Sequence, residues 1–400
     1  MILAPYNLII SILVSIFPII WIYKYCRNEN HLIYLLIYFV HFLIFCFAIL
    51  FYINNFSSDV NGYMDYALNY NGLYKNKERI LIWQPFSTGT SLIKTSTYFF
   101  YNYLYLSKFN IYLIYSSIGL FGFFIYLKNL NFNYGEKKIF KAIVYLLFLL
   151  LPSFHFFSSL VGKEGIFFLI TALLIYSTKD FNNRKILFLL SLFLAFLIRP
   201  QVGLIMFISI TPFYILQYLF NKNNSIYKIT ITILTLIILF ELLCLRFFNL
   251  HFFEFVKIFK LILEQIISRA DLADIGSSGI IISDYNFFQL LFNYLFGPSI
   301  SSIKNYFYFI AAIEGIFLII LISLMISFIN FKKITKIAIF RIFPLISYCF
   351  IFLIVMSYAT SNLGIAIRQK WMILPVIIYI LSYLDFKSNC IAFKKEERNF

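Results

Sequence analysis

The stretch "HLIYLLIYFVHFLIFCFAILFYI", His31 to Ile53, contains no Asp, Glu, Lys or Arg. About 20 consecutive apolar residues are enough for a helix to cross the hydrocarbon core of a bilayer. Apolar runs of this kind recur from one end of the chain to the other. The first run, Met1 to Tyr25, lacks the basic segment and the small-residue cleavage site of a removable signal peptide. We therefore expect it to remain as the first membrane helix.

Composition excludes a soluble globular protein. Hydrophobic residues make up 62% of the 400 residues, and the mean hydropathy is +0.86. We predict an all-α polytopic membrane protein that forms a single integral membrane domain over residues 1–400. The five cysteines have no close pair, which argues against a zinc site or a disulfide framework, so we expect no metal and no cofactor.

The apolar runs predict about eleven transmembrane helices, some of them short or broken. An odd number of crossings with a cytoplasmic C-terminal tail would leave the N-terminus outside. The expected helices cover residues 4–23, 31–53, 110–127, 142–157, 165–178, 186–198, 201–220, 229–246, 306–330, 337–358 and 371–384.

The net charge of +16 follows the expected topology. Cytoplasmic loops of membrane proteins carry an excess of Lys and Arg. Six short segments hold 19 of the 33 Lys and Arg but only 6 of the 17 acids: residues 24–30, 128–141, 179–185, 221–228, 331–341 and the tail from 385. The basic charge is thus mainly a topology signal, and we expect membrane lipid and no nucleic acid as a partner.

Two long segments are expected outside, on the periplasmic face of a bacterial inner membrane. The first, residues 54–110, is rich in Tyr, Asn, Gly and Ser, and its apolar run at 97–106 is a candidate for a further membrane-dipping segment. The second, residues 247–305, opens with "FFEFVKIFKLILEQIISRAD". Its polar positions recur every three or four residues opposite a Phe/Ile/Leu face, which predicts an amphipathic helix in the interface plane.

Three of the expected helices are shorter than a full crossing, and their junctions carry helix breakers. One junction holds Pro152 and "GKEG" (residues 162–165), and the next holds Arg199-Pro200. Irregular backbone at membrane depth is tolerated only where protein or a wet cavity surrounds it. We therefore expect these junctions to line a cavity that opens to the outer face.

Three cations lie at expected outer-face helix junctions: Lys163, Arg199 and Arg368. A lysine near the membrane core is costly unless it is paired or faces a functional cavity. A guanidinium binds phosphate with two hydrogen bonds, so three cations around one cavity can hold a pyrophosphate. The alternatives are an ordinary loop ion pair for Lys163, and for Arg199, which has no acid within ten residues on either side, an arginine that reaches lipid phosphate.

Carboxylates near such a cavity can act as a general base. Transfer of a sugar from a lipid pyrophosphate to a hydroxyl needs a base for the hydroxyl and positive charge for the leaving group. Asp59 and Asp65 in "SSDVNGYMDYA" are candidates, with helix capping as the alternative, and Glu164 is either a further candidate or the neutralising neighbour of Lys163. Tyr63, Tyr66, Tyr70 and Trp83 add rings on which a sugar can stack.

Other polar residues inside the spans have simpler interpretations. Glu241 and Glu314 are candidates for a transport function, because acids within membrane helices often mark ion pathways. The four histidines, His31, His41, His155 and His251, form no cluster with ligand spacing. We expect them at the interface or in the core.

The pattern resembles the Wzy-type O-antigen and capsular polysaccharide polymerases, which are related to the GT-C-like membrane glycosyltransferases. The resemblance covers the topology, and its local features are "DVNGYMDYA", "PSFHFFSSLVGKEG", "LIRPQ" and "SNLGIAIRQK". It implies a multi-pass enzyme of the bacterial inner membrane that joins undecaprenyl-pyrophosphate-linked repeat units for capsule or lipopolysaccharide, alongside a flippase and a chain-length regulator. In this family outer-face arginines are thought to engage the pyrophosphate, a role that Arg199 and Arg368 match by position. Here, however, both lie at short junctions, whereas the arginines of many polymerases lie in large loops.

Two rival functions stay open. A GT-C glycosyltransferase that uses a polyprenyl-phosphate sugar would depend more on Asp59 or Asp65. A flippase or transporter for lipid-linked oligosaccharide would distribute its charges through the depth of the helices, and few charges lie in mid-span.

Overall fold

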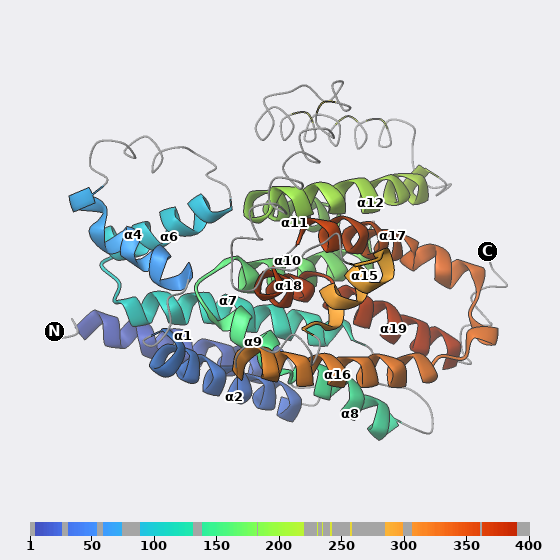
Figure 1. Ribbon diagram of the computed structural model, residues 1–400, viewed down its shortest axis with the longest axis horizontal. Coiled ribbons are helices and arrows are strands. Elements are labelled where there is room, and N and C mark those ends of the chain that lie inside the picture. Colours follow the sequence, from blue (N-terminus) through green and yellow to red (C-terminus); the bar gives the residue numbers. More distant parts are fainter. Residues whose placement is uncertain are drawn as a thin grey trace. The chain divides into compact units, whose positions relative to one another are not determined.

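The computed structural model describes residues 5–25, 31–53, 59–73, 89–130, 138–181, 183–219, 285–298, 306–360 and 362–389, with four isolated positions at 230, 234, 241 and 257 (Figure 1). Throughout this part of the chain the secondary structure is helical and contains no strand. The all-α prediction is therefore confirmed.

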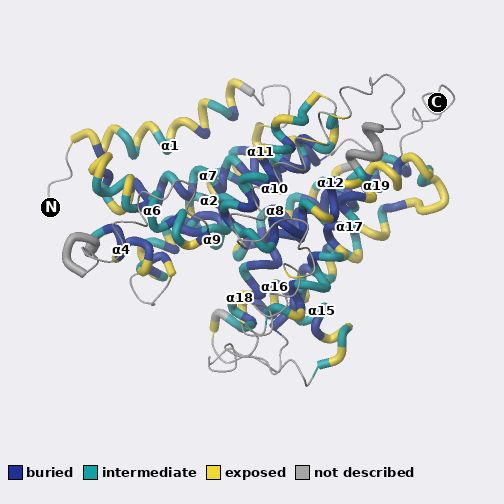
Figure 2. Tube along the Cα trace, turned by 90° about the horizontal axis from the view of Figure 1, so that it is seen from above, coloured by how far each residue is buried: buried dark blue, intermediate teal, exposed yellow. Residues whose placement is uncertain are grey.

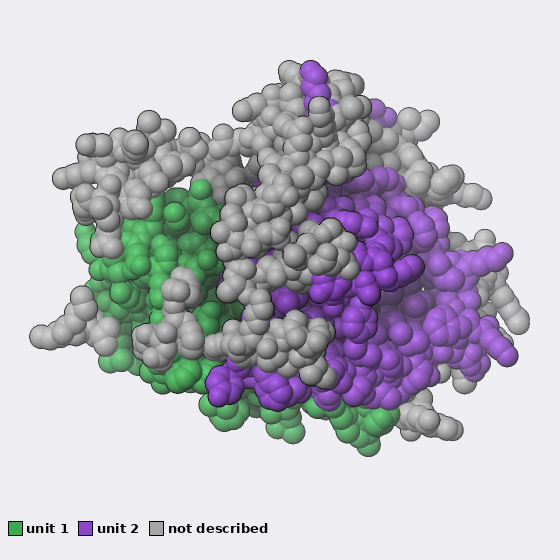
Figure 3. Space-filling model, viewed as in Figure 1, with its two compact units in different colours: residues 1–132, 137–179, 186–199 green, residues 133–136, 180–185, 200–400 purple. Residues whose placement is uncertain are grey.

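The chain divides into two compact units (Figure 3). Unit 1 comprises residues 1–132, 137–179 and 186–199, and unit 2 comprises residues 133–136, 180–185 and 200–400. The helices of unit 1 are α1 (Pro5–Tyr25), α2 (His31–Phe47) with its π-helical end η1 (Ala48–Tyr52), α4 (Asp59–Leu73), α6 (Thr90–Asn102), α7 (Lys108–Asn129), α8 (Lys138–Leu149), α9 (Pro152–Ser159), α10 (Lys163–Thr178) and α11 (Lys185–Ile198). Those of unit 2 are α12 (Pro200–Leu219), α15 (Phe287–Phe296), α16 (Tyr306–Ser327), η5 (Phe331–Lys333), α17 (Lys336–Ala359), α18 (Leu363–Gln369), η6 (Lys370–Met372) and α19 (Leu374–Asn389).

Several helices are long and apolar enough to cross a membrane. Among the described residues there are six, and a seventh if the bent pair α8–α9 is one span. The six are Pro5–Lys24, His31–Tyr52, Lys108–Asn129, Tyr308–Ser327, Lys336–Ala359 and Leu363–Ser388. These helices support a multi-pass membrane protein. The expected number of about eleven is not confirmed: α10 and α11 have 16 and 14 residues, only the part Pro200–Phe213 of α12 counts as an apolar helix, and residues 229–246 lie largely outside the described part.

The predicted junctions are confirmed as helix breaks. Helices α8 and α9 meet at an angle of 44°, with Pro152 as the first residue of α9, where its missing N–H removes no helical hydrogen bond. Helix α10 begins at Lys163, and Arg199 is the single residue between α11 and α12. These breaks place the charged residues at helix ends.

The first predicted outer loop is not irregular. Within residues 54–110, helices α4 and α6 pack against each other and α6 also contacts α7. The Thr97 hydroxyl of α6 hydrogen-bonds the Tyr63 carbonyl, and the Asn102 amide donates to the Ala67 carbonyl at 3.0 Å. In the second predicted loop the described helix is α15, and the expected amphipathic helix at 252–271 lies outside the described residues except for Lys257.

Helix α7 is the centre of unit 1. It packs against α1, α2, α6, α9 and α10, and 72% of its most apolar window is buried, compared with 17% for α1. Figure 2 shows this difference as a mainly dark α7 and a mainly yellow α1. Helix α1 is therefore the peripheral element that exposes apolar side chains to lipid.

Unit 2 is built around α17 and α19. Helix α17 packs against α12, α15 and α19, while α16 packs against α15 and α19. Side-chain caps define two of its helix starts: Thr335 accepts a hydrogen bond from the Ala338 N–H, and Asn362 accepts one from the Ile365 N–H.

Candidate functional site

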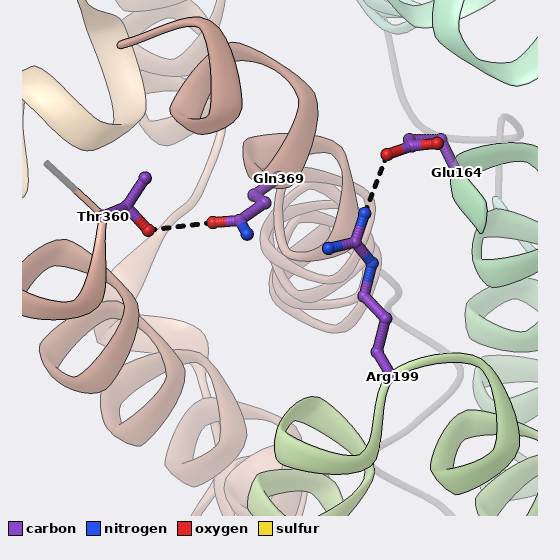
Figure 4. A network of polar contacts seen from close by, with 4 residues as sticks. All are labelled: Glu164, Arg199, Thr360 and Gln369. Carbon is purple, nitrogen blue, oxygen red and sulfur yellow. Dashed lines mark hydrogen bonds and ion pairs between the residues drawn. The ribbon is translucent and has the colours of Figure 1, made fainter. Parts of the chain in front are cut away.

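Arg199 and Glu164 form an ion pair in unit 1. The Arg199 Nη2 donates to Glu164 Oε1 at 2.7 Å, and the two side chains are 16% and 18% exposed (Figure 4). Arg199 comes directly after α11, and Glu164 is the second residue of α10. The sequence-based view of Arg199 as an arginine without an acidic partner is therefore wrong, because its partner lies 35 positions away along the chain.

Lys163 lies at the same place. Gly89, which precedes α6, donates its N–H to the Leu197 carbonyl in the last turn of α11 at 2.7 Å. A Cβ built on Gly89 would lie 3.5 Å from Lys163 Nζ and 3.6 Å from the Ile198 carbonyl oxygen. Lys163 Nζ and the end of α11 thus both lie next to Gly89. Together with the ion pair, this contact brings Lys163, Glu164 and Arg199 close to one another. We call these three residues with Gly89 the junction site.

Close backbone packing positions the junction site. A Cβ on Gly119 of α7 would lie 2.2 Å from the Ser158 carbonyl oxygen, and one on Gly165 of α10 would lie 2.5 Å from the same atom. Real side chains do not approach a carbonyl oxygen so closely. The last turn of α9 therefore packs against both α7 and the first turn of α10, which also contact each other directly, and this packing holds the start of α10 in place.

The electrostatics of the junction site favour an anion. Two cations and one carboxylate leave one net positive charge, and α6 and α10 both begin here with their partially positive N-terminal ends. Within the described residues, the buried Nε of Arg199 has no hydrogen-bond partner. A guanidinium has five N–H donors, so a second acceptor such as a phosphate oxygen can bind beside Glu164.

The other predicted site residues lie elsewhere. Arg368 is half-buried in the last turn of α18 and belongs to unit 2, so its convergence with Lys163 and Arg199 stays a prediction. Asp59 begins α4 and Asp65 lies two turns further on; both are exposed. Tyr63 and Tyr66, suggested for sugar stacking, are buried at 8% and 7% exposure, and Lys94 lies over the Tyr66 ring at 5.0 Å.

Unit 2 contains a buried charged residue beside Arg368 in the sequence. Lys370 is fully buried, and its Nζ has no hydrogen-bond partner among the described residues. Glu314 of α16, 5% exposed, is the acid whose charge acts on it. Nearby in the chain, the Thr360 hydroxyl donates to Gln369 Oε1 at 2.9 Å (Figure 4). From the sequence, Lys370 and Arg368 stand out as two cations against the positive-inside bias, but the complete burial of Lys370 is not predicted.

Fold and site together define a multi-pass helical membrane protein with a positively charged helix junction. Comparison of the chain with protein-family models, curated proteins and solved structures finds no match. Within the described residues, no three His, Cys, Asp or Glu side chains are grouped so that they could hold a metal ion.

Proposed function

We propose that the chain is a membrane glycosyltransferase that polymerises undecaprenyl-pyrophosphate-linked repeat units at the periplasmic face of the bacterial inner membrane. The product is O-antigen or capsule, and the topology has about eleven crossings with both long segments outside. One observation carries the proposal: Lys163 and Arg199 meet at the starts of α6 and α10. Positive charge is what a departing pyrophosphate requires.

The proposed reaction exchanges one glycosidic bond for another. The bond between the anomeric carbon and the phosphate oxygen breaks, and the pyrophosphate leaves with the electron pair. The acceptor hydroxyl oxygen bonds to the anomeric carbon and gives its proton to a carboxylate. Lys163 and Arg199 stabilise the charge that develops on the leaving group.

The ion pair suggests a division of roles among the carboxylates. Glu164 is engaged with Arg199 at 2.7 Å, which favours a counter-ion that holds the guanidinium in place until phosphate binds. Asp59 and Asp65, both exposed, remain the candidate bases. Arg368 is the third proposed contact to the pyrophosphate.

The test combines a gene deletion with single substitutions. Deletion should leave a single repeat unit on the lipid anchor, and complementation by Arg199→Ala or Lys163→Ala should not restore the glycan ladder at normal protein levels. Lys128→Ala is the matched control, because Lys128 is an exposed cation in the last turn of α7, outside the junction site, and the variant should support a full ladder. Wild-type ladders from both site variants would refute the anion site, and complete loss of surface glycan on deletion would refute the polymerase.

Binding distinguishes the GT-C alternative. Purified protein in nanodiscs should bind farnesyl pyrophosphate more tightly than farnesyl phosphate if the site serves a pyrophosphate. The opposite preference would favour a GT-C enzyme that uses a polyprenyl-phosphate sugar.

A transporter is supported by the buried charges of unit 2. Lys370 and Glu314 both lie within helices long enough to span the membrane, as a transport pathway would require. A Lys370→Met variant separates the two functions. A transporter would lose all surface glycan, whereas the polymerase, in which Lys370 has no proposed role, would still give a glycan ladder.

A further inference from the structure

Two histidines are paired in the core of unit 1, far apart in sequence. His41 of α2 and His155 of α9 are both buried, and their Nδ1 atoms are 3.0 Å apart. Phe123 of α7 stacks on the His155 ring with centroids 4.3 Å apart and an interplanar angle of 12°. The described contacts to the two rings come from α2, α7, α8 and α9, and they include no charged side chain.

The partners of the outer ring nitrogens fix the proton positions. His155 Nε2 lies 2.8 Å from the Leu149 carbonyl oxygen, which can only accept, so this nitrogen carries the proton. His41 Nε2 lies 3.0 Å from the Ser116 carbonyl oxygen and 3.1 Å from the Ser116 hydroxyl oxygen, so it also carries a proton and donates to the carbonyl. The two Nδ1 atoms then face each other at 3.0 Å as acceptors, and one proton held between them satisfies both rings.

The result is a chain of hydrogen bonds that runs from Ser116 through His41 and His155 to Leu149. It joins α7, α2 and α9 to the last residue of α8. The bond to Leu149 spans the break between α8 and α9, where the backbone bends by 44°. Networks of this kind specify one arrangement, because a buried donor or acceptor that loses its partner is costly.

The hydrogen bonds of the two histidines influence the junction site through α9. His155 lies one turn before Ser158, whose carbonyl oxygen contacts Gly165 at the start of α10. Any rotation or shift of α9 therefore moves the first turn of α10, which carries Lys163 and Glu164. We propose that His41 and His155 are positioning residues for the junction site. This role rests on the function proposed above, although the proton arrangement does not.

The first experiment reads the tautomers directly. Nitrogen-15 histidine spectra of the purified full-length protein should show both His41 and His155 protonated at Nε2, with one proton shared by their Nδ1 atoms near neutral pH. The protein contains only four histidines, so His31→Gln and His251→Gln variants assign the remaining two signals. A ring without a proton at Nε2, or two rings that exchange freely with water, would overturn the hydrogen-bonded pair.

The second experiment tests positioning. His41→Leu and His155→Leu should each reduce glycan chain extension by on the order of 10²-fold, as expected when a catalytic geometry shifts by about 1 Å. The double variant should lose no more glycan extension than either single variant, because each substitution already breaks the same hydrogen-bonded pair. His41→Asn keeps an amide near the Nδ1 position that can hydrogen-bond His155 Nδ1, and it should recover most of the activity. His31→Leu, at the exposed start of α2, is the control and should have no effect.

The outcomes separate the two proposals. If Arg199→Ala abolishes extension while both leucine variants fold and extend normally, positioning by the histidines is wrong. If Arg199→Ala has no effect while the spectra show the expected tautomers, the proposed function fails and the histidine chain stands as a structural element. If a leucine variant does not fold, the His41→Asn variant and the spectra decide; a His41→Asn variant that folds but lacks activity overturns the proposal.

Discussion

Replacing Gly165 with alanine should disturb the junction site through one atom. The added Cβ would lie 2.5 Å from the Ser158 carbonyl oxygen, whereas ordinary contacts begin at 3.4 Å, so α9 and α10 must separate by about 0.9 Å. Overpacking of this kind costs about 1–3 kcal/mol, and the helical preference of alanine over glycine offsets about 0.5–1 kcal/mol. The expected net loss of stability is about 1–2 kcal/mol.

The effect on function should be larger than the effect on folding. Gly165 follows Glu164 directly, so a shift of the first turn of α10 displaces the carboxylate that holds Arg199. A displacement near 1 Å can reduce catalysis on the order of 10²-fold. Thermal unfolding of the purified variant measures the loss of stability. The glycan ladder that the variant gives in the deletion strain measures the loss of activity.

Gly62→Ala is the matched control. Gly62 lies within α4, and a Cβ there would meet nothing within 4 Å, so alanine should stabilise the helix by about 0.5–1 kcal/mol and leave the ladder unchanged. A Gly165→Ala protein that melts like the wild type and extends glycan normally would show that α9 does not press against α10.

Three further predictions concern charge and backbone. Glu164→Gln should tighten farnesyl pyrophosphate binding by roughly tenfold, because the carboxylate no longer competes for Arg199; weaker binding would contradict the counter-ion role. Gly89→Ala should lower the melting temperature and weaken the same binding, since φ +59° and ψ −121° strain any other residue by about 1–3 kcal/mol and the Cβ faces Lys163 Nζ; an unchanged melting curve would contradict it. Combining Glu314→Gln with Lys370→Met should give a protein that melts higher than Glu314→Gln alone, because the single change leaves a buried ammonium without its acid; equal melting temperatures would exclude electrostatic coupling.

Local sequence signals predicted the helices and their breaks well. Apolar runs located α2, α7 and α17 to within a few residues, and Pro152 and Pro200 marked breaks that the structure has. These features depend only on residues that are close together in the sequence. A continuous apolar run predicts a membrane helix, and a proline, which has no backbone N–H to donate, interrupts one. The segment before α7 was predicted as a loop because it is polar and most of it lacks a strong apolar run. The structure forms α4 and α6 there because these two helices pack against each other.

Long-range partners were beyond the sequence. Glu164 and Arg199 are 35 residues apart and His41 and His155 are 114 apart, so no local pattern indicates either pair. Lys163 and Arg199 could be recognised as charges at helix ends, which is a local property. Gly165 could be recognised as part of the break at residues 162–165, whereas Gly119, which lets Ser158 approach α7, lies inside an apolar helix and carries no local signal.

The hydrogen bond between Gly89 and Leu197 also bears on biosynthesis. During synthesis and membrane insertion, more than a hundred residues must follow Gly89 before its acceptor on α11 leaves the ribosome. Arg199 comes two residues later and completes the ion pair with Glu164, which by then has already been made. The junction site is thus among the last parts of unit 1 to form, so the nascent chain acquires its positive site only when α11 is in the membrane.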